Sequence, residues 1–397
     1  MLETTHTPTI HAGDAEKTRT AIKDHFTSGF ERFESLHQIL NSDQAYFQQP
    51  EPLRHPIIFY LGHTAVFFAN KLKVSKIIDH SIDANIESMM AIGVDEMSWD
   101  DLNQVNYNWP KVDEVYAYRA KVKALVLELI DSLPLSLPIK WEDPFWIILM
   151  GIEHERIHLE TSSVLIRQLE TKYIKQTEQW PLAYQPNNSA QKDIKNKLIH
   201  VPATTVSQNK GQDTYGWDNE YGELTSDVQA FKASQYLVSN AEFLQFVEDG
   251  GYQDTQWWCE EGSAWLAYTN AQKPTFWRKM TDRWQYRSLT QWQDMPWDLP
   301  VDVNYLEAKA FCHWLAARTS QPIRLPSEAE WYALVQHVGI KVDESPEAKS
   351  ANLHLAHGAS AVPVDQFQFG KEQFGDVIGN VWQWTETAID ALPGFKV

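Results

Sequence analysis

Hydrophobic positions in the first 170 residues recur every three or four residues, which is the spacing of one face of an α-helix. The first such stripe consists of Ile22, Phe26, Phe30, Phe33, Leu36 and Leu40. A second apolar segment begins at Pro56, a residue that favours the start of a helix. A third stripe consists of Val115, Tyr118, Val122, Leu125, Leu129 and Leu133. The pattern therefore predicts long amphipathic helices that share one core.

A fourth helix is predicted to begin at Asp143-Pro144, where an N-cap residue precedes a proline at the first helical position. Its inward stripe consists of Ile147, Met150, Gly151, His154, His158, Thr161 and Leu165. Two histidines thus lie among the positions that face the core. Four long helices within the first 170 residues predict a four-helix bundle, a scaffold that builds metal sites from facing helices.

The pattern changes in the second half of the chain. Residues 177–196 are polar and predict a linker between a helical domain, 1–176, and a second domain, 197–397. In the second domain short apolar runs alternate with Gly, Pro, Asn and Trp, and helical spacing is confined to residues 239–248, 305–318 and 327–336. The predicted fold class is therefore α+β, with a helical bundle followed by a loop-rich mixed domain.

Charge and composition narrow the possible environments. The net charge of −19 argues against nucleic acid or an anionic membrane surface as a partner. Only two cysteines, Cys259 and Cys312, are present, which fits a reducing compartment. The first residues lack the apolar core of a signal peptide, and the apolar run at 57–70 is too short to span a bilayer. We expect a cytoplasmic protein.

The candidate chemistry lies in three histidines. His154 and His158 are four residues apart, so on a helix their imidazoles lie one above the other and can bind one ion. His63 lies in another apolar helical segment and is the third candidate ligand. Three imidazoles leave coordination positions open for substrate, but imidazole alone suits Zn, Cu, Fe and Ni alike.

The acidic neighbours of these histidines have alternative interpretations. Glu155 would be the general base if the stretch His154-Glu155-Arg156-Ile157-His158 were a zinc-protease motif. Glu153 and Glu160 could accept hydrogen bonds from ligand imidazoles, or they could be surface charges, which we favour for Glu153.

The second half resembles the formylglycine-generating-enzyme, or sulfatase-modifying-factor, family. The resemblance is carried by four segments: Gly216-Trp217-Asp218-Asn219-Glu220, Val238-Ser239-Asn240-Ala241-Glu242-Phe243, Arg324-Leu325-Pro326-Ser327-Glu328-Ala329-Glu330-Trp331 and Gly379-Asn380-Val381-Trp382-Gln383-Trp384. It implies a C-type-lectin-like fold. Trp382 and Trp384 would be core anchors of that fold or would line a cleft, and Cys312, on an apolar helical pattern, is expected in the core.

The first half resembles the DinB-like bundles, in which three histidines hold a metal. In this order the two halves resemble the ergothioneine and ovothiol sulfoxide synthases, and the resemblance places the iron ligands at His63, His154 and His158. Two details favour the ovothiol branch. Ile157 stands where the ergothioneine branch carries Gln, and residues 103–110 lack the arginines that would hold a γ-glutamyl group.

The resemblance also suggests that the domain is incomplete at its C-terminus. The chain ends at Val397, whereas the family domain continues with a Gly-Gly-Ser-Trp-like segment that completes the substrate site. The catalytic tyrosine expected there has no counterpart in this sequence, so no catalytic residue is assigned. A methyltransferase domain or protein is a possible downstream partner.

The leading hypothesis is an iron(II), Fe(2+), and oxygen-dependent oxidoreductase that joins the sulfur of cysteine to the imidazole of histidine and yields 5-histidylcysteine sulfoxide. The substrates would be cysteine, histidine and O2. The alternatives are an ergothioneine-type synthase that acts on trimethylhistidine, a DinB-type divalent-metal thiol transferase that uses no oxygen, and a non-catalytic binding protein.

Overall fold

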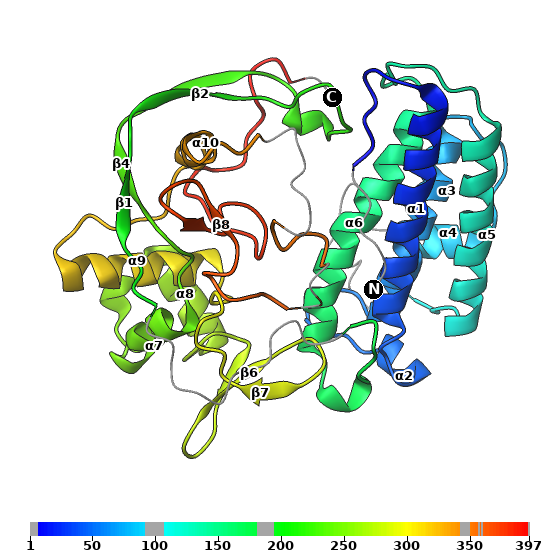
Figure 1. Ribbon diagram of the computed structural model, residues 1–397. Coiled ribbons are helices and arrows are strands. Elements are labelled where there is room, and N and C mark those ends of the chain that lie inside the picture. Colours follow the sequence, from blue (N-terminus) through cyan, green and yellow to red (C-terminus); the bar gives the residue numbers. More distant parts are fainter. Residues whose placement is uncertain are drawn as a thin grey trace. The chain divides into compact units, whose positions relative to one another are not determined.

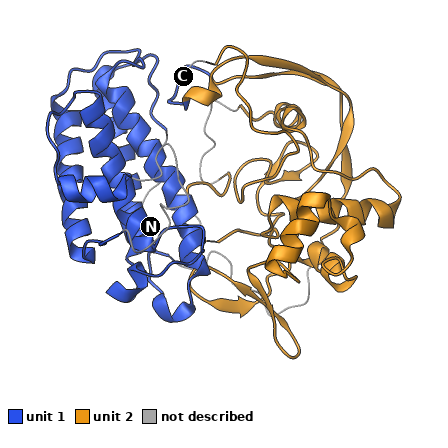
Figure 2. Ribbon diagram, turned by 180° about the vertical axis from the view of Figure 1, so that it is seen from behind, with its two compact units in different colours: residues 1–181, 211–217 blue, residues 182–210, 218–397 orange. Residues whose placement is uncertain are grey.

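The computed structural model describes residues 7–91, 107–180, 194–341, 350–355, 358 and 360–395. The chain forms two compact units, one of residues 1–181 and 211–217 and the other of residues 182–210 and 218–397 (Figure 2). The first unit is helical and the second mixes helices with short strands, so the predicted α+β class is confirmed.

All four predicted long helices are present in the first unit (Figure 1). They are α1 (Ala15–His37), α3 (Ile57–Val74), α5 (Val112–Ser132) and α6 (Pro144–Gln168). Three short elements accompany them: α2 (Asp43–Tyr46), α4 (Ala84–Met90) and the 3₁₀ turn η3 (Thr171–Tyr173).

The helix starts follow capping chemistry. The Asp14 carboxylate accepts hydrogen bonds from the backbone N–H groups of Glu16 and Lys17, which α1 leaves unpaired. Asp143 occupies the predicted N-cap position of α6, but its carboxylate accepts from the backbone N–H of Lys140 instead. Pro144 therefore starts α6 without a side-chain cap.

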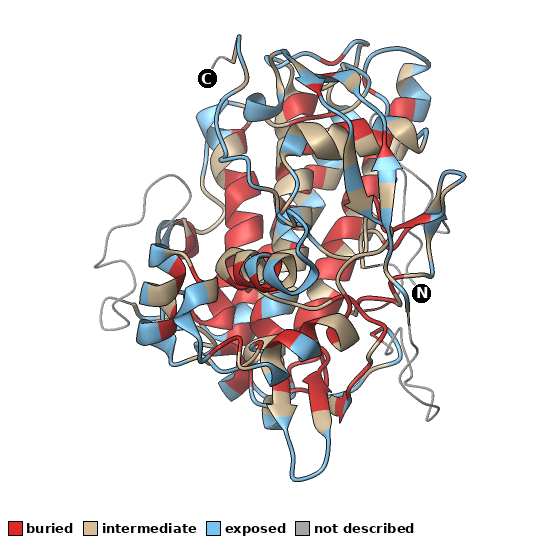
Figure 3. Cartoon of the chain, turned by 90° about the vertical axis from the view of Figure 1, so that its left-hand side faces the viewer, coloured by how far each residue is buried: buried red, intermediate tan, exposed pale blue. Residues whose placement is uncertain are grey.

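Helix α3 packs against α4, α5 and α6, and every residue from Ile57 to Ala69 is buried. Figure 3 shows the chain coloured by burial, with buried positions recurring along its helices. Two glycines allow the close contacts of α3. A Cβ added to Gly151 of α6 would lie 2.2 Å from the ring of Phe68, and one added to Gly62 would lie 1.9 Å from the Met90 sulfur. These glycines set how closely α3 approaches α6 and α4.

One segment beyond the predicted linker packs with the helical unit. The backbone N–H of Ile10 donates to the carbonyl of Asp213, and the ring of Tyr215 lies 4.9 Å from that of Trp146. The predicted linker, 177–196, falls largely outside the described residues. The domain bounds 1–176, 177–196 and 197–397 therefore stay a prediction.

The strands of the second unit are short and antiparallel. The pairs are β1 (Leu198–Val201) with β4 (Phe231–Ser234), β2 (Thr204–Gln208) with β3 (Leu224–Val228), and β8 (Gln368–Phe369) with β9 (Phe374–Gly375). A three-stranded sheet has the order β5 (Trp277–Lys279), β6 (Trp284–Arg287) and β7 (Trp292–Asp294).

The three predicted helices of this unit are confirmed as α7 (Asn240–Glu248), α9 (Tyr305–Thr319) and α10 (Glu328–His337). Each begins with a capping box in which the N-cap side chain and a glutamate three residues later satisfy each other's backbone N–H groups. Helix α8 (Glu260–Thr269) was not predicted, and the 3₁₀ turns are η4 (Asp218–Glu220) and η5 (Thr255–Trp257).

Aromatic side chains fill the core of the second unit, where Phe243, Phe246 and Phe311 pack against Trp277 and Trp314. Cys312 is buried, as predicted. Trp382 and Trp384 are 72% and 49% exposed within the described residues, so their interpretation as core anchors is wrong. In the part of the chain that the structure describes, no helix is long and apolar enough to cross a membrane.

Candidate metal centre

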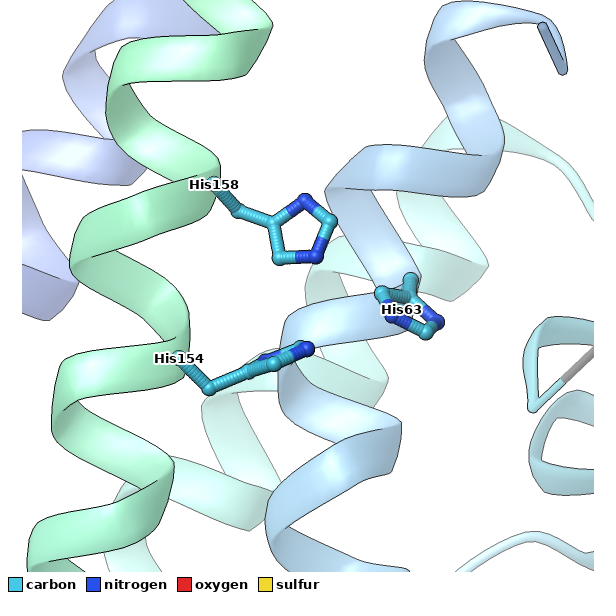
Figure 4. Close-up of side chains that lie close together, drawn as sticks. All are labelled: His63, His154 and His158. Carbon is cyan, nitrogen blue, oxygen red and sulfur yellow. The ribbon is translucent and has the colours of Figure 1, made fainter. Parts of the chain in front are cut away.

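The structure brings the three predicted histidines together (Figure 4). His63 extends from α3 and is buried, whereas His154 and His158 extend from α6 and are half-buried. The ring centroids lie 5.2 Å apart for His63 and His154, 5.0 Å for His63 and His158, and 4.5 Å for His154 and His158. One nitrogen from each ring lies within 4.8 Å of the other two.

The nitrogen–nitrogen distances among the three histidines are slightly wider than those of imidazoles that already bind a metal ion. With metal–nitrogen bonds of about 2.0–2.2 Å, neighbouring ligand nitrogens lie roughly 3–4 Å apart. The observed limit of 4.8 Å therefore leaves a closure of about 1 Å, which small rotations of the imidazole rings can supply. The arrangement is that of a site that can contract around one ion.

A main-chain carbonyl fixes the orientation of His63. Its Nδ1 lies 2.8 Å from the carbonyl oxygen of Met90, the last residue of α4. Because a carbonyl only accepts, Nδ1 carries the proton, and the lone pair of Nε2 is left for a metal. A hydrogen bond of this kind commonly orients a metal-binding histidine.

Aromatic rings orient two of the imidazoles. Phe67 stacks on His154 with centroids 3.8 Å apart and an interplanar angle of 8°. Phe59 stacks on His63 at 4.9 Å and 24°. These phenylalanines lie four residues before and after His63, so all three side chains share one face of α3.

Two nitrogens of the site have no hydrogen-bond partner among the described residues. They are Nδ1 of His154 and Nδ1 of His158, and both are buried. For His154 the stacked ring of Phe67 takes the orienting role that a hydrogen-bond acceptor usually plays. Because no described group fixes the tautomer of these two rings, one nitrogen of each ring can carry the proton while the other presents its lone pair to an ion.

Burial lowers the pKa of all three histidines. It lowers the pKa of His158 to about 3, and the nearby His63 imidazole adds to the effect. The pKa of His154 falls for the same reason, with added repulsion from His158 and His63, and burial lowers that of His63 despite its bond to Met90. At neutral pH the three rings are therefore uncharged, which is the form that binds metal, and the donor set fits a divalent ion.

Glu155 does not face the three histidines as a free base. Its carboxylate is 2% exposed and accepts hydrogen bonds from Arg119 at 2.7 Å and from the Thr64 hydroxyl at 3.2 Å. A general base of a zinc protease must instead reach the metal-bound water. The structure therefore argues against the zinc-protease interpretation.

The sequence favoured a surface charge for Glu153, but the structure shows that its carboxylate has a buried partner. Its carboxylate lies 2.9 Å from Nε2 of His25, a fully buried residue of α1. Burial lowers the pKa of His25, and the hydrogen bond to Glu153 opposes that shift. This contact joins α1 to α6 one residue before His154.

Comparison with known protein families identifies both halves. The sulfatase-modifying factor enzyme 1-like domain matches residues 185–394, more than half of the chain. The chain belongs to this family. The DinB superfamily matches residues 25–162, which include all three histidines. The pair of domains is that of the sulfoxide synthase family, so the predicted fold and the prediction of an oxidoreductase are confirmed.

Similar proteins have names from ergothioneine biosynthesis. "Hercynine oxygenase" of Mycolicibacterium smegmatis is 25% identical over 95% of this chain and 85% of its own length. The protein of that name from Mycolicibacterium thermoresistibile is 33% identical over 46% of this chain and 41% of its own length. "Ergothioneine biosynthesis protein 1" of Schizosaccharomyces pombe is 22% identical over 90% of this chain and 46% of its own length.

These names favour the ergothioneine branch of the sulfoxide synthase family, and the expected ovothiol branch gains no support from them. The two local departures on which that expectation rested are Ile157 and the arginine-free stretch 103–110. Only residues 107–110 of that stretch lie in the described part of the chain.

Sequence reasoning missed several residues that surround the three histidines. Phe59 and Phe67 were counted only as apolar positions, although their spacing of four from His63 was visible. Met90 contributes a backbone carbonyl, which leaves no trace in the sequence. Arg119 interrupts the third apolar stripe between Tyr118 and Val122, and a charge at an inward position was the one available signal.

Proposed function

We propose that this protein is an iron(II)- and oxygen-dependent sulfoxide synthase of the ergothioneine type. It would join the sulfur of a cysteine-type thiol to an imidazole carbon of hercynine, which is trimethylhistidine. The observation that carries the proposal is the convergence of His63, His154 and His158 in a chain whose relatives are named hercynine oxygenases.

The overall reaction balances without a further reductant. The thiol S–H and one imidazole C–H bond break, one C–S bond forms, one oxygen atom of O2 ends on sulfur, and the other leaves as water with the two hydrogens. All four electrons that reduce O2 come from the two substrates. The three neutral imidazoles would hold iron, whose role is to activate oxygen beside the bound thiolate.

The surrounding residues have supporting tasks in this proposal. Met90 and Phe59 fix the ring of His63, and Phe67 fixes that of His154. Rings that are kept from turning by large angles hold the open coordination positions in nearly constant directions, so that the two substrates meet in one geometry. The burial of His63 also limits access of bulk water to the ion.

A second candidate acceptor is free histidine. Ile157 favours it, because this residue precedes the last candidate ligand, is 42% exposed, and offers no polar group where the ergothioneine branch carries Gln. The arginine-free stretch at 103–110 likewise favours free cysteine over a γ-glutamyl thiol as sulfur donor. The relatives weigh more heavily, so hercynine is the leading acceptor.

The test is a competition assay with protein reconstituted anaerobically with Fe(II). Cysteine or γ-glutamylcysteine is supplied with equal amounts of hercynine and histidine, and oxygen uptake is compared with sulfoxide formed by mass spectrometry. We expect one sulfoxide per O2, mainly from hercynine, and no uptake by His154→Ala. Preferential turnover of histidine would show that histidine, and not hercynine, is the acceptor. Thiol transfer that proceeds with zinc and without oxygen would overturn the proposal in favour of a DinB-type transferase.

A further inference from the structure

Arg119 of α5 is the most deeply buried charge near the three histidines. Its side chain has no exposed surface, and its guanidinium lies 4.1 Å from the ring centre of Phe30. Nη2 donates to Glu155 at 2.7 Å, and Nη1 donates to the Thr64 hydroxyl at 2.8 Å and to the Leu61 carbonyl at 2.9 Å. One guanidinium on α5 thus contacts all three of the other long helices, α1, α3 and α6.

Arg119 also donates from Nε to the Glu34 carboxylate of α1 at 3.0 Å, but two of its other partners are sequence neighbours of candidate metal ligands. Thr64 directly follows His63 on α3, and Glu155 directly follows His154 on α6. The Thr64 hydroxyl also donates to the Glu155 carboxylate at 3.2 Å, so the three side chains form a closed triangle. Below, "the Arg119 network" means Arg119, Glu155 and Thr64.

Stability alone does not account for this arrangement. Removing two charges from water costs about as much as their attraction returns, and well-packed apolar residues often serve a fold equally well. The directional contribution is different, because a planar guanidinium with fixed donors accepts only one placement of its partners. A buried ion pair can therefore specify how two helices align even where it adds little stability.

A metal site needs such alignment. Ligand distances must hold to about 0.2 Å, whereas sliding one helix by a single residue moves a side chain by about 1.5 Å along the axis and turns it by about 100°. His63 stands on one helix and its two partners stand on another, so their spacing depends on how α3 sits against α6.

We propose that the Arg119 network positions the metal ligands by locking α3 against α6 next to His63 and His154. Its members are positioning residues, since none of them faces the three imidazoles as a ligand. The inference rests on the proposed function only in its requirement that the histidines bind a metal.

The experiment measures metal affinity in the whole chain by Co(II) titration, with the absorption bands of the bound ion as a second readout. Thr64→Val and Glu155→Gln keep side-chain shape and remove one link each. We expect each to lower Co(II) affinity about tenfold or more, as loss of groups that support metal ligands does, and to alter the bands while far-UV circular dichroism is retained. Glu31→Gln is the matched control, because the pair Lys123–Glu31 also joins α5 to α1, at 2.8 Å, but on the surface.

A double variant separates positioning from stability. In Arg119→Met with Glu155→Leu the two charges that are at most 2% exposed are replaced by apolar side chains, while Glu34, which is 22% exposed, can still be hydrated. The metal-free double variant should therefore melt no earlier than Glu155→Gln while its Co(II) affinity stays low. Wild-type affinity and bands in Thr64→Val and Glu155→Gln would overturn the inference, as would affinity that returns in the double variant together with stability. If the wild-type chain itself bound no Co(II) or Fe(II), the proposed function would fail first.

Discussion

Gly151→Ala tests the close contact of helices on which the histidine cluster depends. Gly151 lies three residues before His154 on α6, and an added Cβ would lie 2.2 Å from Cε1 and 2.3 Å from Cδ1 of Phe68. That ring is 1% exposed and packs edge-on against Phe26 at 5.5 Å, so it has no free space to enter. Helix α3 must therefore move away from α6 by at least about 1 Å before the two carbon atoms reach an ordinary van der Waals distance.

The magnitude follows from two opposing terms. Overpacking of a filled core costs about 1–3 kcal/mol, and a contact this short belongs near the upper end of that range. Alanine in place of glycine inside a helix returns about 1 kcal/mol. We expect Gly151→Ala to lower the free energy of unfolding by about 1–2 kcal/mol.

Gly29→Ala is the matched control. Gly29 lies inside α1, and its added Cβ would meet Arg156 at 3.7 Å, an ordinary contact. This substitution keeps the helix-propensity term without the clash, so it should raise the free energy of unfolding by up to about 1 kcal/mol. The two variants should thus differ by about 2–3 kcal/mol.

The assay is urea unfolding of the metal-free protein followed by far-UV circular dichroism, whose helical signal comes mainly from the first unit. The shift of α3 should also move His63 away from its partners, so Co(II) affinity should fall in Gly151→Ala and stay unchanged in Gly29→Ala. A Gly151→Ala protein as stable as Gly29→Ala, with wild-type metal affinity, would refute the close contact of α3 and α6.

Three further predictions address orientation, specificity and pH. Phe67→Leu should weaken Co(II) binding by loss of the ring stacked on His154, whereas Phe67→Tyr should preserve it; equal affinities would show that stacking is irrelevant. Ile157→Gln should raise the ratio of hercynine to histidine turnover, and an unchanged ratio would remove this position from substrate selection. Burial raises the pKa of Glu307 to about 7 from 4.5, so the folded state holds the proton more tightly than the unfolded state. The contribution of Glu307 to stability is complete below pH 4.5 and is lost as the pH rises to about 7. Glu307→Gln should therefore flatten the dependence of the free energy of unfolding on pH in this range. An unchanged slope would contradict the prediction.

The sequence was most informative where one local rule decided the outcome. The stripe from Ile22 to Leu40 predicted α1, although the helix ends before Leu40, at His37, and proline at position 144 predicted the start of α6. The convergence of His63 with His154 and His158 was also predictable, because a spacing of four on an inward face leaves few directions for the rings.

Features that depend on the packing of distant segments were not predictable. The bonds of Arg119 to Thr64 and Glu155 require a particular rotation of α5 against two other helices, and no local pattern encodes that rotation. Trp382 looked like a core residue by its type, yet burial is decided by what packs over it. Helix α8 was missed because its glycine and scattered aromatic residues give no clear helical stripe.

The central claim is that His63, His154 and His158 together hold one iron ion, and X-ray absorption of the anaerobically Fe(II)-loaded protein tests it most directly. We predict one iron per chain with about three imidazole nitrogens at roughly 2.0–2.2 Å. His63→Ala and His154→Ala should each lose that stoichiometric iron while they remain folded. Iron that binds with the same stoichiometry and the same imidazole shell in both variants would contradict the account.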